Sequence, residues 1–394
     1  MTTIYEPPTT AIPGQTPLTG EGGPAGPGGP AGYGYGGGGG GGRPTRRVPR
    51  LLIAATATAV GLATFLGLHD AGLMATQAPL TTAQITAKVS PGLVDVVSTL
   101  GFQQAEGAGT GLVLTSSGEV LTNNHVVDGA TSISVRDIGN GRTYRASVVG
   151  YDQHHDIAVL QLHGAAGLQT VDLGDSSTAA TGQRVVALGN AGGKGGAPSV
   201  VTGRIVGTNA SIGAADQLAG TVEQLHGLIS HNAGIQPGDS GGPLVNRSGQ
   251  VIGIDTAGGQ SPSGQTQGFA IPINQATSIA RQIEAGTASA TVHIGATGLM
   301  GVQIMQANAA AANGVPAGSG ATVAGILPGS PAASAGLQAG DVIVSVDGHR
   351  VTSPEGLQSA LEPHHPGDRI TVGWTSQLGQ TQSGTLTLTT GPAD

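Results

Sequence analysis

The sequence predicts an all-β protein, and three observations support this fold class. Glycine occurs 71 times among the 394 residues, whereas only nine residues are aromatic (three Phe, five Tyr and one Trp). Short runs rich in Val, Ile and Thr are separated by glycine-rich turns, which is typical of consecutive β-strands. This composition argues against a helical bundle. The chain also has no cysteine, which excludes disulfides, cysteine-bound structural zinc and thiol catalysis.

Residues 1–50 form the first region, which we expect to be a disordered cytoplasmic tail. It is dominated by Pro, Gly, Thr and Ala, and it includes the run Gly36–Gly42. Such a segment cannot bury enough apolar surface to offset the entropy lost on ordering. The Gly-Pro triplets that start at Gly23 resemble collagen, but their register is lost after a few triplets, so we reject a triple helix.

An uncharged run from Leu51 to Leu68 follows four arginines within residues 43–50. A helix of this length spans about 27 Å, close to the roughly 30 Å hydrocarbon core of a bilayer. The arginines before the run, with no matching cluster after it, predict a cytoplasmic N-terminus and an extracytoplasmic C-terminus. We therefore expect a transmembrane helix over residues 51–70 and a linker over 71–82. The alternatives are a cleaved signal peptide and a buried core helix, although the preceding tail is long for a signal peptide.

The charge distribution bears on partners. Residues 1–50 carry four arginines and two glutamates, a net charge of +2. Since the whole chain has a net charge of −8, the remaining residues carry −10. A dilute, acidic region has no basic face for nucleic acid. His154, His155, His364 and His365 stand beside Asp or Pro in polar segments, where exposed loop histidines are the simpler interpretation than a metal site. We expect neither a metal nor a cofactor.

The segment Ile235–Leu244 carries the chemistry, because it places the hydroxyl of Ser240 among glycines. A serine that attacks a peptide carbonyl generates an oxyanion, and neighbours without side chains let the N–H groups of Gly238 and Ser240 converge on it. Glycine at 238 and 241 also permits backbone angles that other residues avoid. Alone, the pattern is equally compatible with a Gly/Pro turn between two strands.

Two further residues favour catalysis over a turn. His125 follows an apolar strand, and Asp156 directly precedes the apolar run Ile157–Leu162. Each has a simpler interpretation by itself, as a core histidine or as a turn residue. Together with Ser240 they stand in the order His, Asp, Ser, separated by 31 and 84 residues, which is the order found in chymotrypsin-like proteases.

With these residues, the chain resembles a trypsin-like serine protease of the HtrA (Deg) family in a membrane-anchored bacterial form. The matching segments are Gly109–Leu114, Leu121–Val127, Val149–Asp152, Val186–Asn190, Val251–Ile254 and Gly268–Pro272. The resemblance implies a chymotrypsin-like double β-barrel protease domain over residues 83–286, with six strands in each barrel. It places His125 and Asp156 on the first barrel, and Ser240 with the oxyanion hole of Gly238 and Ser240 on the second.

The domain limits and one departure from the family follow from the same comparison. We expect amphipathic helices near Thr82–Val89 and Pro272–Ala285 at the two ends of the protease domain, and a division between the barrels near Asp175–Thr181. Many HtrA proteases carry Asn before the serine, whereas this chain has Asp239. Because no activation site is visible that would supply a new N-terminus to this acid, we expect Asp239 to bond to another partner.

The resemblance also suggests which residues form the substrate pocket. Gly234, six residues before the serine, stands where this fold has the base of the P1 pocket, with Ile235 beside it. Without an acid at the base, we expect a small or medium aliphatic P1 residue rather than Lys or Arg. Ile254 and Asp255 are the other expected pocket residues, and Asp255 could reach the pocket wall.

Residues 296–390 resemble the PDZ domain that follows HtrA protease domains. Ser330–Ala333 predicts a capped helix start, Val346–His349 a tight hairpin, and Ser353–Glu355 the start of a helix with Leu357 and Leu361 on one face; Leu337–Ile343 is the most typical motif. The resemblance implies that a peptide's terminal carboxylate and final residues bind along Leu299, Met300, Gly301 and Val302. The alternative is a β-sandwich that serves as a spacer.

The function expected from these features is a membrane-anchored serine endopeptidase that cleaves misfolded or exported proteins outside the cytoplasmic membrane, with a PDZ domain that binds peptide C-termini. The alternative is a low-turnover chaperone or PDZ-based scaffold of the cell envelope. The intact set of His125, Asp156 and Ser240 favours the enzyme, because a pure binding protein needs none of the three. The family resemblance also implies a homotrimer.

Overall fold

The computed structural model describes residues 78–101, 104–215, 222–260, 266–306, 309–310, 314, 316 and 318–392. The expected tail over 1–50, the expected membrane helix over 51–70 and most of the linker over 71–82 lie outside these residues. In the part of the chain that the structure describes, no helix is both long and apolar enough to cross a membrane.

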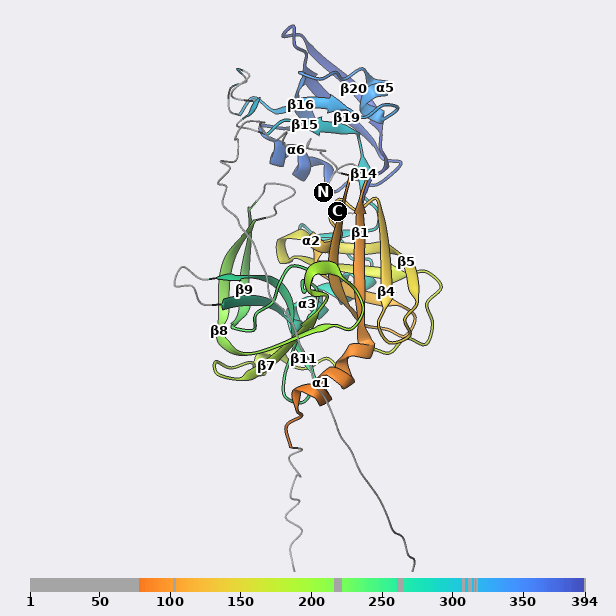
Figure 1. The fold of residues 1–394 in the computed structure, drawn as a ribbon. Coiled ribbons are helices and arrows are strands. Elements are labelled where there is room, and N and C mark those ends of the chain that lie inside the picture. The colour runs from red at the N-terminus through yellow and green to blue at the C-terminus, as the bar shows by residue number, and fades with distance from the viewer. Residues whose placement is uncertain are drawn as a thin grey trace, which may run out of the picture. The chain divides into compact units, whose positions relative to one another are not determined.

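Six strands close into the first barrel, which we call barrel 1 (Figure 1). They are β1 (Leu93–Leu100), β2 (Ala105–Val113), β3 (Glu119–Thr122), β4 (Ser132–Asp137), β5 (Thr143–Asp152) and β6 (Ile157–Leu162). Their order is β5-β4-β1-β2-β3-β6, and an antiparallel pairing of β5 with β6 closes the ring. A seventh strand, β13 (Val292–Ile294), adds to the free edge of β5.

Barrel 2 is built from the next six strands. They are β7 (Arg184–Gly189), β8 (Ser199–Ala215), β9 (Val222–His231), β10 (Pro243–Val245), β11 (Val251–Gln260) and β12 (Thr266–Pro272). These strands form a closed barrel in the order β10-β11-β12-β9-β8-β7. The chain passes between the barrels through the short helix η3 (Ser176–Thr178), which agrees with the division predicted near 175–181. The predicted double β-barrel is confirmed.

Helices stand where the apolar spacing predicts them. Helix α1 (Thr82–Val89) starts with a capping box between Thr81 and Gln84, and it buries Ile85. Helix α3 (Ile273–Glu284) follows β12 and buries its apolar face. The remaining short helices of the protease region are α2 (Asn124–Val127), η1 (Ser90–Gly92), η2 (Gln153–His155) and η4 (Ala191–Gly193).

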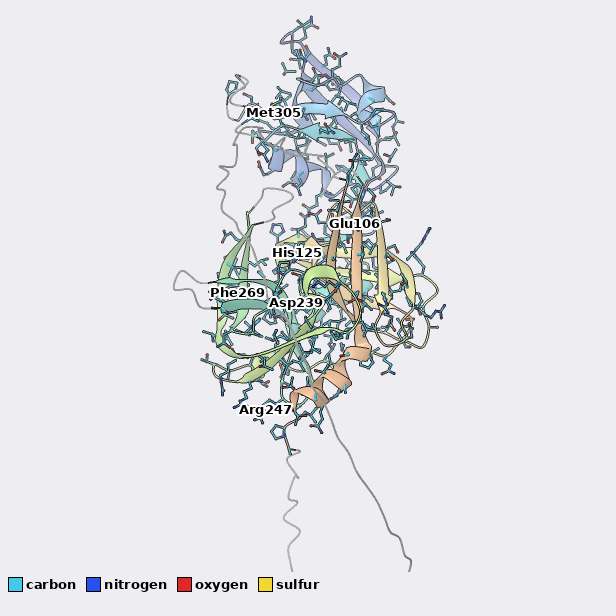
Figure 2. All side chains as sticks on the ribbon, viewed as in Figure 1. Glu106, His125, Asp239, Arg247, Phe269 and Met305 are labelled. Carbon is cyan, nitrogen blue, oxygen red and sulfur yellow. The ribbon has the colours of Figure 1, made fainter. Side chains whose placement is uncertain are left out.

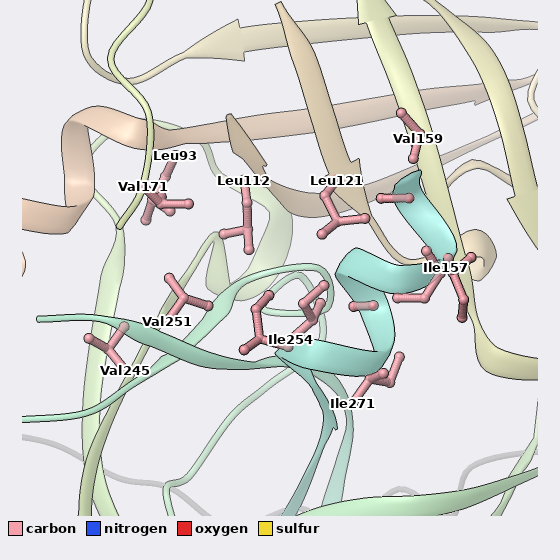
Figure 3. Packing of buried hydrophobic residues seen from close by; sticks show 14 of the residues in the cluster. Leu93, Leu112, Leu121, Ile157, Val159, Val171, Val245, Val251, Ile254 and Ile271 are labelled. Carbon is pink, nitrogen blue, oxygen red and sulfur yellow. The ribbon is translucent and has the colours of Figure 1, made fainter. Parts of the chain in front are cut away.

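The largest hydrophobic cluster joins the two barrels and α3 (Figure 3). Leu112 and Leu121 enter it from barrel 1, and Val251 and Ile254 enter it from barrel 2, all four with no solvent exposure. Burying each of these side chains stabilises the fold by roughly 1.5–3 kcal/mol. The cluster therefore fixes the junction of the barrels, where the expected catalytic residues lie.

The PDZ region has its own sheet and its own core. Its strands are β14 (Gly298–Leu299), β15 (Val302–Ile304), β16 (Ala321–Ile326), β17 (Val342–Val346), β18 (His349–Arg350), β19 (Arg369–Thr375), β20 (Thr381–Thr387) and β21 (Thr389–Thr390). Ser330 caps α5 (Pro331–Ala335), and α6 (Pro354–Leu361) buries two leucines on one face, as predicted. The hairpin between β17 and β18 turns through two residues with positive φ, at 347 and 348.

Candidate active site

An acid–base pair lies on barrel 1, where α2 follows β3. Nδ1 of His125 is 2.8 Å from Oδ2 and 3.0 Å from Oδ1 of Asp156. The backbone N–H of His125 also donates to Oδ1, at 3.0 Å. The Asp156 side chain is 2% exposed and the His125 side chain 37% exposed. A buried carboxylate therefore orients a partly exposed imidazole, as general-base catalysis requires. His125 is labelled in Figure 2.

A strained turn presents Asp156 to the histidine. Its backbone is left-handed, with φ 53° and ψ 49°, an uncommon conformation for a residue other than glycine. The Asn123 side chain donates to the Asp156 carbonyl at 2.9 Å and holds this conformation. Asp152, four residues earlier, caps the preceding η2 helix by accepting from the N–H of His155, and its carboxylate also contacts the ring of His155. Asp152 thus shapes the turn, while Asp156 carries the bond to His125.

The nucleophile expected from the sequence sits in a loop of barrel 2 between β9 and β10. We call residues 236–241 the serine loop. Gly238 and Gly241 have φ of 97° and 82°, and a Cβ on them would overlap the carbonyls of Asn190 and Thr110, respectively. Among the described residues, none accepts a hydrogen bond from the N–H of Gly238 or Ser240. These two N–H groups are available to stabilise an oxyanion.

Thr110 of β2 ties the serine loop to barrel 1. Its hydroxyl donates to the carbonyl of Gly238 at 2.8 Å and accepts from the N–H of Asn190 at 2.9 Å, while its own N–H donates to the carbonyl of Ser240 at 2.8 Å. In the sequence, Thr110 belongs to the matching segment Gly109–Leu114, but nothing in the sequence indicates its role. The bonds span 80 to 130 residues, so local patterns could not reveal them.

Thr256 of β11 contacts both the nucleophile and the acid. Its carbonyl accepts from the Ser240 hydroxyl at 3.3 Å, a long and weak bond. Its own hydroxyl donates to Oδ2 of Asp156 at 2.5 Å. The residue therefore links the two barrels across the site. No sequence motif singled it out.

Asp239 finds a partner within barrel 2, as the sequence led us to expect. Its buried carboxylate accepts from the Ser199 hydroxyl at 2.7 Å and from the backbone N–H of Gln236 at 2.9 Å. Gly189 leaves room for it, because a Cβ there would approach the carboxylate to 2.6 Å. These contacts brace the loop from inside the barrel. Asp239 is labelled in Figure 2.

The four expected pocket residues divide into two pairs. Gly234 and Ile235 are partly exposed, and the Ile235 side chain lies against Gly258 of β11. Ile254 belongs to the core cluster between the barrels, and the carboxylate of Asp255 is fully buried against His231. Neither Ile254 nor Asp255 offers an exposed side-chain surface to a substrate.

In the PDZ region, the segment expected to bind a peptide carboxylate leads into β15. Gly301 has φ 79°, and a Cβ on it would overlap Ser330, so this position requires glycine. Its carbonyl accepts from the N–H of Leu327 at 3.0 Å, while the carbonyl of Met300 accepts from Ala332 at 2.9 Å. Strand β15 ends the order of its sheet, so in the described residues one edge has no partner strand.

Comparisons with known proteins agree with this architecture. Residues 109–254 match the family model of a trypsin-like peptidase domain, and residues 322–374 match that of a PDZ domain. The periplasmic pH-dependent serine endoprotease DegQ of Escherichia coli is 36% identical over 275 residues, covering 69% of this chain and 57% of that protein. A probable periplasmic serine protease do/HhoA-like of Haemophilus influenzae is 38% identical over 270 residues, covering 68% and 55%.

A third relative matches a larger share of this chain. The serine protease PepD of Mycobacterium tuberculosis is 34% identical over 336 residues, which cover 80% of this chain and 67% of that protein. The chain spans little more than half the length of the first two relatives.

Proposed function

The chain belongs to the HtrA family of trypsin-like serine proteases with a C-terminal PDZ domain, and we propose that it is itself a serine endopeptidase. Ser240 acts as nucleophile, His125 as general base and Asp156 as the acid that orients the imidazole. One observation carries the proposal: the bonded His125–Asp156 pair contacts, through Thr256, the same loop that presents Ser240. A binding protein gains nothing from that arrangement.

The proposed reaction is acyl transfer. The Ser240 hydroxyl turns from the Thr256 carbonyl, gives its proton to His125, and its oxygen bonds to the substrate carbonyl carbon. The N–H groups of Gly238 and Ser240 stabilise the resulting oxyanion. Collapse of the intermediate releases the amine, which takes the proton from His125. Water, deprotonated by His125, then adds to the acyl-enzyme and releases the acid while Ser240 regains its proton.

The substrate preference we propose is a small or medium apolar P1 residue. Gly234 and Ile235 are the partly exposed members of the expected pocket, and neither carries a charge. The carboxylate of Asp255 is turned toward His231 in the interior. A Lys or Arg at P1 would therefore lack an accessible counter-charge.

The PDZ region is proposed to bind the free C-terminus of a peptide as an added strand on β15. The left-handed turn at Gly301 and the edge position of β15 support this mode. Family resemblance further suggests that bound peptide raises proteolysis. A coupling of about 1–3 kcal/mol would change the activation equilibrium about 5–150-fold.

We propose that the protein acts on misfolded or exported proteins outside the cytoplasmic membrane, held there by the segment Leu51–Leu68, and that it assembles as a homotrimer. Two relatives are named periplasmic proteases, which supports the location, and the arginines at 43–50 support the orientation. Protease treatment of intact spheroplasts should degrade residues 71–394. Protection of that region would overturn the orientation.

Enzymatic activity is tested directly with the purified full-length protein. We expect it to cleave an unfolded protein and to react with a serine-directed phosphonate, with the adduct mapped to Ser240. Absence of both cleavage and adduct would leave the chaperone or scaffold as the function.

A further inference from the structure

A fully buried histidine–aspartate pair lies inside barrel 2, and the proposed chemistry does not use it. His231 ends β9, and Asp255 lies in β11. Nε2 of His231 is 2.9 Å from Oδ1 of Asp255, and both side chains are 0% exposed. Gly268 of β12 makes room for the imidazole, because a Cβ at that position would overlap the ring.

Stability alone is a poor reason for such a pair. Removing two ionisable groups from water is costly, and apolar side chains of similar volume often stabilise a core better. Nδ1 of His231 and Oδ2 of Asp255 also have no hydrogen-bond partner in the described part of the chain, which adds to the cost. A buried, incompletely bonded pair of this kind calls for a role beyond packing.

The backbone of Asp255 is bonded directly to the residues that follow the nucleophile. Its N–H donates to the carbonyl of Gly242, and its carbonyl accepts from the N–H of Gly241, both at 2.8 Å. The next residue is Thr256, which contacts Ser240 through its carbonyl and Asp156 through its hydroxyl. His231 thus holds the side chain of Asp255, and Asp255 directly precedes Thr256, the residue that links Asp156 to Ser240.

Thr256 occupies an irregular position in the strand. The register between β11 and β12 shifts between Asp255 and Ala257, so that Thr256 is the extra residue of a bulge. A slip of one residue would turn its side chain to the opposite face of the sheet, away from Asp156. The strand continues with Gly258 and Gly259, and glycine-rich strands specify register weakly. The bulge therefore needs an anchor outside its own strand pairing.

We propose that His231 is a positioning residue: its hydrogen bond to Asp255 fixes the bulge at Thr256 and so holds the Thr256 contacts with Asp156 and Ser240 in register. The inference rests on the proposed function. According to this proposal, strand β11 sets the catalytic geometry together with the serine loop.

The electrostatics fit this role. Burial raises the pKa of the Asp255 carboxyl, the facing His231 opposes that rise, and the Asp239 carboxylate in the serine loop adds to it. Without His231, the Asp255 carboxylate would keep the cost of burial and the repulsion from Asp239, with no compensating donor from β9. The Asp255 carboxyl group would then either stay protonated or move out of its position. In both cases no side chain of β9 would anchor the bulge at Thr256.

Two substitutions of His231 by amide side chains of different length distinguish a positioning role from simple packing. In His231→Gln, the amide nitrogen lies where Nε2 lies, so the bond to Asp255 is kept. In His231→Asn, the shorter side chain cannot reach it. We expect His231→Asn to lower kcat on the order of 10–100-fold with KM within about threefold, since small misplacements of reacting groups cost that much. We expect His231→Gln and Asp255→Asn to stay within about fivefold of wild type. His226→Asn, an exposed histidine on the same strand, is the matched control.

A double-variant cycle tests the route through Thr256. If His231 acts through this residue, adding His231→Asn to Thr256→Val should cost little beyond Thr256→Val alone. The downfield proton resonance of the His125–Asp156 bond should shift in His231→Asn and not in His231→Gln. This resonance needs no turnover, so it reports on the positioning role even if the protein cleaves no substrate.

Three results would overturn the inference: equal kcat for His231→Asn and wild type, an equal loss in His231→Gln and His231→Asn, or fully additive effects in the cycle. If His231→Asn does not fold, two substitutions of Asp255 make the same comparison: Asp255→Asn keeps an oxygen that can accept from His231, whereas the shorter side chain of Asp255→Ser does not reach it. A wild-type protein with neither hydrolysis nor phosphonate labelling would instead refute the proposed function.

Discussion

In barrel 1 most bonds of the acid–base pair join residues that are close in sequence, with Thr256 of barrel 2 as the exception. In barrel 2 the serine loop is held by its own buried Asp239, by backbone bonds and by hydroxyl groups from distant strands. His125, Asp156 and Asn123 lie within 33 residues of one another and bond directly. The serine loop depends instead on Thr110, 128 residues away, and on Ser199, 40 residues away.

The difference predicts how each side fails. Barrel 1 should be sensitive to the loss of a particular polar atom, because each contact is a single side-chain bond. The serine loop should be sensitive to added side chains at its glycines and to the loss of the buried Asp239 that braces it. The predictions below compare the two sides, from the largest expected effect to the smallest.

Ser240→Ala should lower kcat/KM about 10⁶-fold, because it removes the atom that bonds to the substrate. Peptide binding to the PDZ region should be unchanged, as measured by fluorescence anisotropy of a labelled peptide with an apolar C-terminus. Residual cleavage within about tenfold of wild type would show that Ser240 is not the nucleophile.

Asp156→Asn should lower kcat about 10⁴-fold, because an amide favours the wrong tautomer of His125. Asp152→Asn is the matched comparison, four residues away and equally buried. Asp152 bonds to His155 in the turn before Asp156 and to the hydroxyl of Thr291, so we expect a loss below about tenfold. Steady-state kinetics on one peptide substrate measures both. If the two variants exchanged behaviours, Asp152 would be the catalytic acid.

Asp239→Ala should lower kcat by about 10²–10³, the cost of losing one oxyanion donor, because Gln236 and the loop after it lose their internal brace. Asp239→Asn keeps an oxygen for the Gln236 N–H and should lose less. Ser199→Ala removes only the second contact and should lose least. Acylation rates with the phosphonate measure the series, and equal rates across it would show that the loop does not depend on Asp239.

The contrast between the barrels also explains what the sequence could predict. The helices at residues 82–89 and 273–284 and the PDZ hairpin follow from local spacing and turn chemistry, the double barrel follows from the family resemblance, and the structure has all of them. The reacting groups were visible because their residue types stand in a characteristic order. Thr110, Thr256 and His231 were not, because their roles arise from strand pairing between segments far apart in sequence. Asp255 was assigned to a pocket wall, since its position near the serine loop was foreseeable but its buried partner was not.

The smallest effect concerns a carboxylate at the contact between the barrels. Asp95 of β1 is buried, and it accepts from the N–H of Gly196 in the segment after β7, at 3.0 Å. Burial raises its pKa, although the Gly196 bond and Arg136 on the neighbouring strand oppose this. The folded state therefore holds a proton that the unfolded state releases at lower pH, and wild-type stability is lost as pH rises through the folded pKa.

Asp95→Asn keeps an oxygen for Gly196 and removes the ionisation. Its stability relative to wild type should be equal or lower below about pH 4 and should become higher as pH rises, by less than about 1 kcal/mol because the Gly196 bond and Arg136 offset part of the cost of burial. Urea unfolding between acid and neutral pH measures the difference.

Asp175 should show the opposite dependence of stability on pH. Hydrogen bonds from Asn274 and Ser177 lower its pKa, so its contribution to stability is present at neutral pH and is lost on acidification. Asp175→Asn should therefore destabilise at neutral pH. If both variants changed stability in the same direction with pH, something other than these two ionisations would govern the pH dependence at the junction of the barrels.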